Sequence, residues 1–210
     1  MRQNYFTVNG ETENVIVIER SKFICNVKGI NDELEAKAFV ESIKKRHTLA
    51  NHYCYAYIAD EGGLNQKFSD AGEPQGTAGL PMLEVLKNKR MYKTVAVVTR
   101  YFGGIKLGTG GLTRAYGGSV SECLKVANVV NMSDSDFINI NLDYEKYSKL
   151  IKFLNDASVS IISTEFNNDV LVNFAIKSNQ TNSFINKITD AFNGKINCVV
   201  VGNGYHAFKD

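Results

Sequence analysis

The stretch Val95-Ala-Val-Val-Thr-Arg-Tyr-Phe-Gly-Gly-Ile-Lys-Leu-Gly-Thr-Gly-Gly-Leu-Thr-Arg-Ala-Tyr116 contains the strongest pattern in this chain. It opens with an apolar, β-branched run, Val95 to Thr99, which is long enough for one buried strand and too short for a helix. From Leu112 onward, apolar residues recur at helical spacing. The stretch therefore predicts a buried strand, a glycine-rich turn and a helix start.

Six glycines mark this turn and the first part of the helix: Gly103, Gly104, Gly108, Gly110, Gly111 and Gly117. Glycine permits positive φ and close approach of a ligand or another backbone, and free N–H groups at a helix start favour anions. Arg100, Lys106 and Arg114 add three cations. The turn predicts phosphate or RNA-backbone binding, with a purely structural tight turn as the alternative. Neither the Walker nor the dinucleotide-binding pattern is present.

The composition is that of an ordinary globular protein. The chain has 210 residues, of which 44% are hydrophobic and 22% are charged, which fits one large or two small domains. It has no apolar run of membrane-spanning length and no signal-peptide core. Its four cysteines are scattered, as expected for reduced thiols rather than for disulfides or a zinc site. We expect a cytoplasmic protein with no membrane partner, metal or cofactor.

The charge is unevenly distributed along the chain. Residues 1–133 carry 17 Lys and Arg against 13 Asp and Glu, whereas residues 134–210 carry 7 against 9. A modestly basic first part permits contact with nucleic acid without demanding it.

Two further stretches carry candidate chemistry. His52 to Ile58 alternates as a strand, with His52 and Cys54 on one face as a base–nucleophile pair or as metal ligands. Ser69 to Pro81 is an irregular loop containing Asp70 and Glu73, which fit acid–base catalysis or a divalent cation. The alternative for these carboxylates is that they cap local N–H groups or pair with arginines.

The polar segment Asn131–Asp136 predicts a domain boundary, which gives domains 1–133 and 134–210. The second domain follows the order β-α-β-β-α-β, the ferredoxin-like arrangement. It lacks any catalytic cluster in its sequence, so we interpret it as a docking or binding module. The predicted elements are strands 137–142, 159–166, 170–176 and 196–201, and helices at 144–154 and 184–192.

Three stretches, 50–56, 70–79 and 98–116, resemble the IMPACT family of bacterial YigZ type. The resemblance implies an α+β fold, with a first domain similar to the fourth domain of elongation factor G and to GHMP-type kinases. It also implies a ferredoxin-like second domain. Eukaryotic members are implicated in translational control, through the activator of an initiation-factor kinase, and the family implies no settled activity for bacterial members.

The family motif carries over to the following positions: His52, Asp70, Glu73, Arg100, Tyr101, Gly103, Gly104, Gly108, Gly110, Gly111 and Arg114. The chain departs from the pattern at Ala71, where the family often has a second acid, and at Gln75, where serine is common. The missing acid weakens any mechanism that needs paired carboxylates or two metals.

From these patterns we expect a non-catalytic regulator associated with translation, which binds RNA, the ribosome or a translation-related protein. The expected phosphate-binding or nucleic-acid-binding residues are Arg100, Tyr101, Gly103, Gly104, Lys106, Gly108, Gly110, Gly111 and Arg114. The alternative is an enzyme acting on a phosphate substrate, with His52, Asp70 and Glu73 as catalytic candidates. In either case Arg100, Arg114, Asp70, Glu73 and His52 should converge on one concave site.

Overall fold

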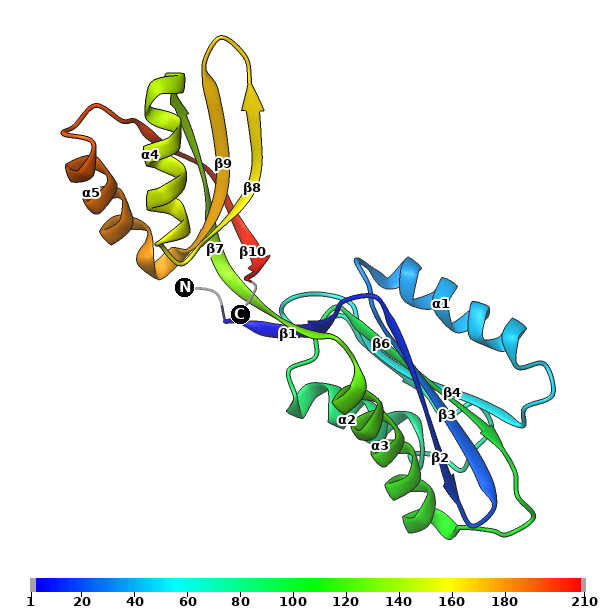
Figure 1. Cartoon of the computed structure of the whole chain (residues 1–210). Helices are drawn as coiled ribbons and strands as arrows, with labels where there is room; N and C mark the ends of the chain where they lie inside the picture. The colour runs from blue at the N-terminus through cyan, green and yellow to red at the C-terminus, as the bar shows by residue number, and fades with distance from the viewer. Residues whose placement is uncertain (1–2, 209–210) are drawn as a thin grey trace. The chain divides into compact units, whose positions relative to one another are not determined.

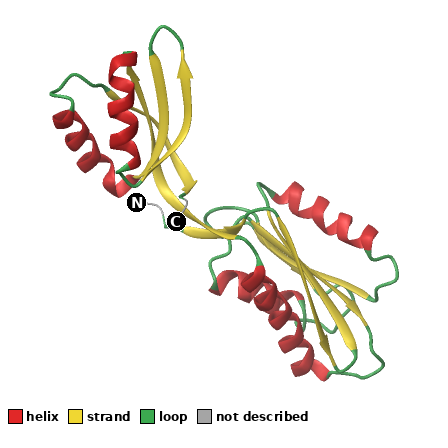
Figure 2. Ribbon diagram, in the orientation of Figure 1, coloured by secondary structure: helices red, strands yellow, loops and turns green. Residues whose placement is uncertain are grey.

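The computed structural model describes residues 3–208, which form two compact units (Figure 1). The first unit is Tyr5–Val130. The second comprises residues 131–208 together with residues 3 and 4. The α+β character expected from the sequence is present in both units, each of which combines one antiparallel sheet with helices (Figure 2).

The sheet of the first unit has five antiparallel strands, and the strand of the glycine-rich stretch lies at its centre. In spatial order the strands are β2 (Glu11–Ile18), β3 (Ser21–Gly29), β6 (Thr94–Tyr101), β4 (His52–Ile58) and β5 (Gln66–Ser69). All but the last residue of β6 are buried, as its continuous apolar run predicts. A short strand, β1 (Tyr5–Val8), contacts β3.

Helices cover both faces of this sheet (Figure 1). Helix α1 (Glu33–Arg46) lies on one face, while α2 (Gly79–Asn88) and α3 (Gly108–Val126) lie on the other. The side chains of β4 alternate between the two cores as predicted. Cys54 packs in the α2/α3 core and Tyr57 packs in the α1 core.

Side-chain hydrogen bonds to the backbone define the start of α1. The backbone N–H of Glu35 donates to the Asp32 carboxylate at 2.9 Å, and the Glu35 carboxylate accepts the N–H of Asn31 at 2.9 Å. This arrangement resembles a capping box, except that Glu35 accepts the N–H of the residue before the N-cap Asp32, and it fixes the first turn of the helix.

The second unit has the element order β-α-β-β-α-β that the sequence predicts. Its strands lie in the order β8, β9, β7, β10, and its two helices lie on the same face of the sheet (Figure 1). The elements are β7 (Val129–Leu142), α4 (Tyr144–Asn155), β8 (Val159–Phe166), β9 (Val170–Lys177), η1 (Ser178–Gln180), α5 (Thr181–Ala191) and β10 (Cys198–Ala207).

The polar segment predicted as a boundary is not a loop. Residues 131–136 lie inside β7, and β10 pairs with this part of the strand through Met132 to Asp136. Ser133 and Ser135 are buried, and the Ser135 hydroxyl donates to the Ser133 carbonyl at 2.8 Å. Hydrogen bonding of polar side chains and ladder pairing therefore sustain a strand that hydrophobicity alone does not predict.

Among residues 3–208, no helix has both the length and the apolar character needed to cross a membrane.

Candidate functional site

Asp70 closes the loop that precedes α2. Its carboxylate accepts three backbone N–H groups, those of Gly76 at 2.8 Å, Ala78 at 3.0 Å and Gly79 at 2.8 Å. Since a carboxylate that accepts several N–H groups satisfies donors otherwise left unpaired at a helix start, this side chain holds the loop in shape. The structure thus places Asp70 as an internal cap.

Glu73 lies at the centre of a buried polar cluster. Its Oε1 accepts from Arg100 Nη1 at 2.7 Å and from the Tyr116 hydroxyl at 2.6 Å. The side chains of Glu73 and Arg100 are only 4% and 6% exposed. Tyr116 comes from α3 and Arg100 from β6, so the pair connects the loop, the sheet and the helix. The Glu73 charge is compensated inside the protein.

Arg100 is enclosed by further contacts. Its Nη2 donates to the Ser21 hydroxyl at 3.3 Å, and its guanidinium stacks over the rings of Phe23 and Phe102, at 5.3 and 5.5 Å from their centroids. Its Nε is buried and has no hydrogen-bond partner among the residues that the structure describes. The cation faces the interior rather than solvent, because residue 100 of β6 points toward α3.

Tyr116 is held as a neutral hydrogen-bond donor. Burial, followed by the proximity of Cys54 and Glu73, raises the pKa of its hydroxyl far above the ordinary tyrosine value. A neutral phenol beside a carboxylate donates a proton to the hydrogen bond without ionising. Its role in the cluster is therefore to stabilise the Glu73 carboxylate.

His52 is the candidate catalytic side chain that combines access to solvent with a free ring nitrogen. It is 25% exposed, its Nε2 lies 3.9 Å from Glu73 Oε1, and its Nδ1 lies 3.0 Å from the Ala71 carbonyl oxygen. The carbonyl can only accept, so Nδ1 carries the proton and donates to it. In the neutral ring, Nε2 is therefore unprotonated and faces the Glu73 carboxylate. A protonated ring would form an ion pair with that carboxylate.

Cys54 lies next to this cluster but is not activated. Its thiol donates to the Asp70 carbonyl at 2.9 Å, and burial raises its pKa to about 12. Because the thiolate is the nucleophile, the predicted pairing of His52 as base with Cys54 as nucleophile finds no support in this geometry.

We expect Cys54 to resist thiol reagents in the folded protein. A pKa of about 12 leaves roughly 3,000-fold less thiolate near neutral pH than a free cysteine with pKa about 8.5. The measurement is peptide-level mass spectrometry after timed labelling with iodoacetamide, with the urea-unfolded chain as the control. Labelling of native Cys54 at the unfolded rate would contradict the buried, neutral thiol.

The glycine-rich turn packs tightly at one end and is open at the other. A Cβ on Gly103 would lie 2.0 Å from the Arg20 carbonyl carbon, and the Gly103 N–H donates to the Ser21 hydroxyl at 3.1 Å. Gly104 and Gly108 adopt positive φ of 87° and 69°, with open space around both. Close packing against the β2–β3 turn therefore explains why residue 103 is glycine, without any need for a bound phosphate.

The first turn of α3 is exposed and lacks a side-chain cap. Leu107 precedes the helix and makes no side-chain hydrogen bond to it, and the turn itself contains Gly108, Gly110 and Gly111. Lys106 and Arg114 are exposed here, and neither forms an ion pair within residues 3–208. The Arg114 guanidinium lies beside the turn, 3.8 Å from where a Gly110 Cβ would be.

Tyr101 lies elsewhere. Its hydroxyl is 3.2 Å from His47 Nδ1 at the end of α1, on the opposite face of the sheet from Arg100. Alternation along a strand explains this separation, because neighbouring residues point to opposite faces.

The structure thus brings together four of the five residues expected to converge: His52, Asp70, Glu73 and Arg100. Contacts link each of these to the loop around Ala71, whereas Arg114 lies at the exposed start of α3. Within the described part of the chain, no three His, Cys, Asp or Glu side chains are grouped as a metal site requires.

Sequence reasoning missed two members of the cluster, Ser21 and Tyr116. Tyr116 belongs to the helical apolar pattern, so its position predicts burial but not its bond to Glu73. The available signal was its hydroxyl, since a buried tyrosine usually finds a hydrogen-bond partner. Ser21 carries no such signal, because it is a small polar residue at the start of β3, directly after the hairpin turn.

Comparison with known proteins identifies both units. Residues 19–124 match the Impact N-terminal domain, and residues 140–195 match a domain of unknown function, DUF1949. The chain is 44% identical to IMPACT family member YvyE of Bacillus subtilis, over 93% of this chain and 90% of that protein. It is 34% identical to IMPACT family member YigZ of Escherichia coli, over 88% and 91% of the two chains.

A solved structure described as the crystal structure of a hypothetical protein is 31% identical in sequence, with a TM-score of 0.61. The match covers 96% of this chain and 99% of that one. Since the relatives match along nearly their whole length and both units are covered, the chain belongs to the IMPACT family.

Proposed function

We propose that this protein is a non-catalytic regulator associated with translation, which binds RNA through the exposed start of α3. One observation carries the proposal: Lys106 and Arg114 flank an uncapped, glycine-rich helix start, and neither has an acidic partner among the described residues. Free N–H groups and unpaired cations together favour phosphate oxygens. The family resemblance to eukaryotic regulators supports the link to translation.

The buried cluster supports a non-catalytic role. Asp70 accepts three N–H groups, Glu73 Oε1 accepts from both Arg100 and Tyr116, and Cys54 is neutral. A general base needs a free lone pair within reach of a substrate proton. Only His52 has both exposure and a free ring nitrogen, which keeps the phosphate-substrate enzyme as the second candidate.

The test is a salt titration of the binding of an RNA hairpin, with the full-length protein. The Lys106→Ala/Arg114→Ala variant should bind more weakly, and its slope of log affinity against log salt should be shallower by about two, one for each lost phosphate contact. Lys125→Ala is the matched control, because Lys125 lies at the far end of the same helix and is paired with Glu122 at 2.6 Å.

Identical slopes for wild type and double variant would overturn the proposed RNA site. Absence of RNA binding at low salt, together with capture by a ribosomal or other translation protein, would assign the regulator a protein partner instead. Phosphate release that His52→Gln abolishes would identify the enzyme, with the glycine-rich turn holding the substrate phosphate.

A further inference from the structure

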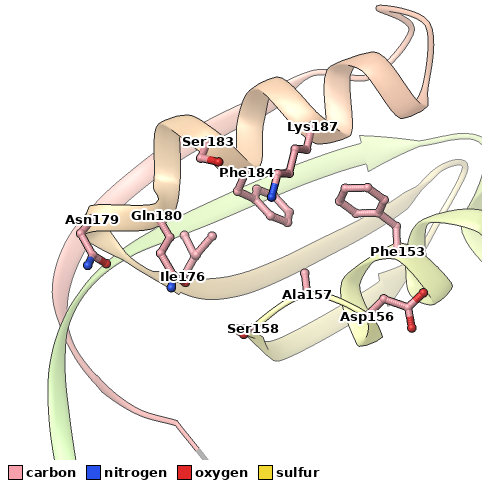
Figure 3. Close-up of a pocket in the computed structure, with 10 residues that line it drawn as sticks. All are labelled: Phe153, Asp156, Ala157, Ser158, Ile176, Asn179, Gln180, Ser183, Phe184 and Lys187. Carbon is pink, nitrogen blue, oxygen red and sulfur yellow. The ribbon is translucent and has the colours of Figure 1, made fainter.

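The second unit contains a cavity of about 620 Å³ that the proposed function does not use. It lies between the end of α4, the end of β9 and the first two turns of α5 (Figure 3). Small-molecule sites commonly have volumes of about 300–1,000 Å³ and combine an apolar wall with a few polar groups. The size and lining of this cavity match that description.

One wall of the cavity is apolar and ordered. Phe153 of α4 and Phe184 of α5 meet edge to face, with ring centroids 5.8 Å apart, and Ile176 of β9 extends the wall. In Figure 3 the Ala157 methyl group also points into the space. An aliphatic or aromatic group of a ligand would bury apolar surface by packing against these side chains.

Two opposite charges lie at the cavity, one from each helix. Asp156 directly follows the end of α4, Ser183 and Lys187 come from α5, and Gln180 is the last residue of η1, just before α5 (Figure 3). None of these four side chains has a hydrogen bond or ion pair with another residue in the range 3–208. Their polar groups are therefore available to a ligand.

The start of α5 already holds an anion. The Asp136 carboxylate accepts from the hydroxyls of Thr181 at 2.6 Å and Ser178 at 3.2 Å. Among the residues that line the cavity, Asp156 is the one acidic side chain and Lys187 the one basic side chain. The surroundings therefore favour a ligand with no net charge.

We propose that this cavity binds a free α-amino acid with an apolar side chain. The carboxylate pairs with Lys187, the ammonium group pairs with Asp156, and the side chain packs against Phe153, Phe184 and Ile176. A zwitterion is the smallest ligand that uses both charges and the apolar wall together.

The test is isothermal titration calorimetry of the full-length protein with L-leucine and L-phenylalanine. We expect saturable binding of at least one of them. The comparison ligands are 3-phenylpropionate, which lacks the ammonium group, and 2-phenylethylamine, which lacks the carboxylate. Each should bind at least about tenfold more weakly than L-phenylalanine, because each leaves one charged group of the protein unpaired.

Three variants locate the site. Lys187→Met and Asp156→Asn should each weaken binding about tenfold or more, and Ala157→Leu should block the cavity while leaving both charges in place. The matched controls are Lys152→Met and Asp190→Asn, exposed residues of the same two helices outside the cavity. Circular dichroism of each variant confirms that it has folded.

Three results would overturn the proposal. These are no binding of either amino acid at about 10 mM, equal binding of 3-phenylpropionate, and binding that survives Ala157→Leu in a folded protein. The last result would place the ligand elsewhere on the chain.

Discussion

Replacing Arg100 with methionine is expected to lower the free energy of unfolding of the first unit by about 3–5 kcal/mol. The Glu73 carboxylate is 4% exposed and lies 2.7 Å from Arg100 Nη1, so removing the cation leaves a buried charge with the Tyr116 hydroxyl as its one hydrogen-bond donor within residues 3–208 and with His52 Nε2 3.9 Å away. Methionine keeps much of the packing against Phe23 and Phe102, which isolates the electrostatic loss. Thermal unfolding should show a midpoint lower by about 10 °C or more.

A double-mutant cycle separates the ion pair from its surroundings. Glu73→Gln alone should also be destabilising, but the double variant should be more stable than the sum of the two losses predicts, by about 2 kcal/mol. The exposed pair Glu84 and Lys87, 3.3 Å apart, provides the matched cycle, with an expected coupling below about 0.5 kcal/mol. Additive losses at Glu73 and Arg100 would show that the pair is not a coupled unit.

Replacing Gly103 with alanine is expected to destabilise the first unit by about 3 kcal/mol or more, the upper end of the usual costs of overpacking. The added methyl group would lie 2.0 Å from the Arg20 carbonyl carbon and 2.3 Å from the Ser21 nitrogen. These are backbone atoms, so the whole β2–β3 turn must move to make room. Such a movement would also disturb the Ser21 contact to Arg100.

Gly118→Ala is the matched control for this substitution. Gly118 lies within α3, and a Cβ there meets nothing within 4 Å. Since alanine is the better helix former, we expect a stability gain of about 0.5–1 kcal/mol. Chemical denaturation in one buffer at one temperature measures the free energy of unfolding of both variants. Equal stabilities for the two would contradict the argument from close approach.

The sequence predicted elements best where apolar periodicity was strong. The β6 strand, helix α3 and the order of elements in the second unit follow their patterns closely. The short strand β5 and the first part of β7 were missed, because their residues are mostly polar and are held by ladder hydrogen bonds that periodicity cannot detect.

The site was predictable as a group of residues but not as a set of contacts. The motif stretches named His52, Asp70, Glu73 and Arg100, and these residues do come together. Which arginine pairs with Glu73 depends on side-chain direction across three elements. Arg100 points inward from a buried strand, whereas Arg114 lies on the solvent side of α3. Spacing along the chain carries no information about that choice.

Residues 3 and 4 group with the second unit although they precede the first. The Asn4 side chain accepts the Asp134 N–H at 3.2 Å, and the Gln3 carbonyl accepts from the Tyr205 hydroxyl at 3.1 Å. During synthesis residues 3 and 4 must therefore wait for β10, which follows all the other described strands in the sequence. The Tyr5–Val130 unit has all its residues much earlier. The first unit can therefore fold before the partners of residues 3 and 4 have been synthesised, and a single protease cut after residue 130 would leave those two residues attached to the fragment that contains the first unit.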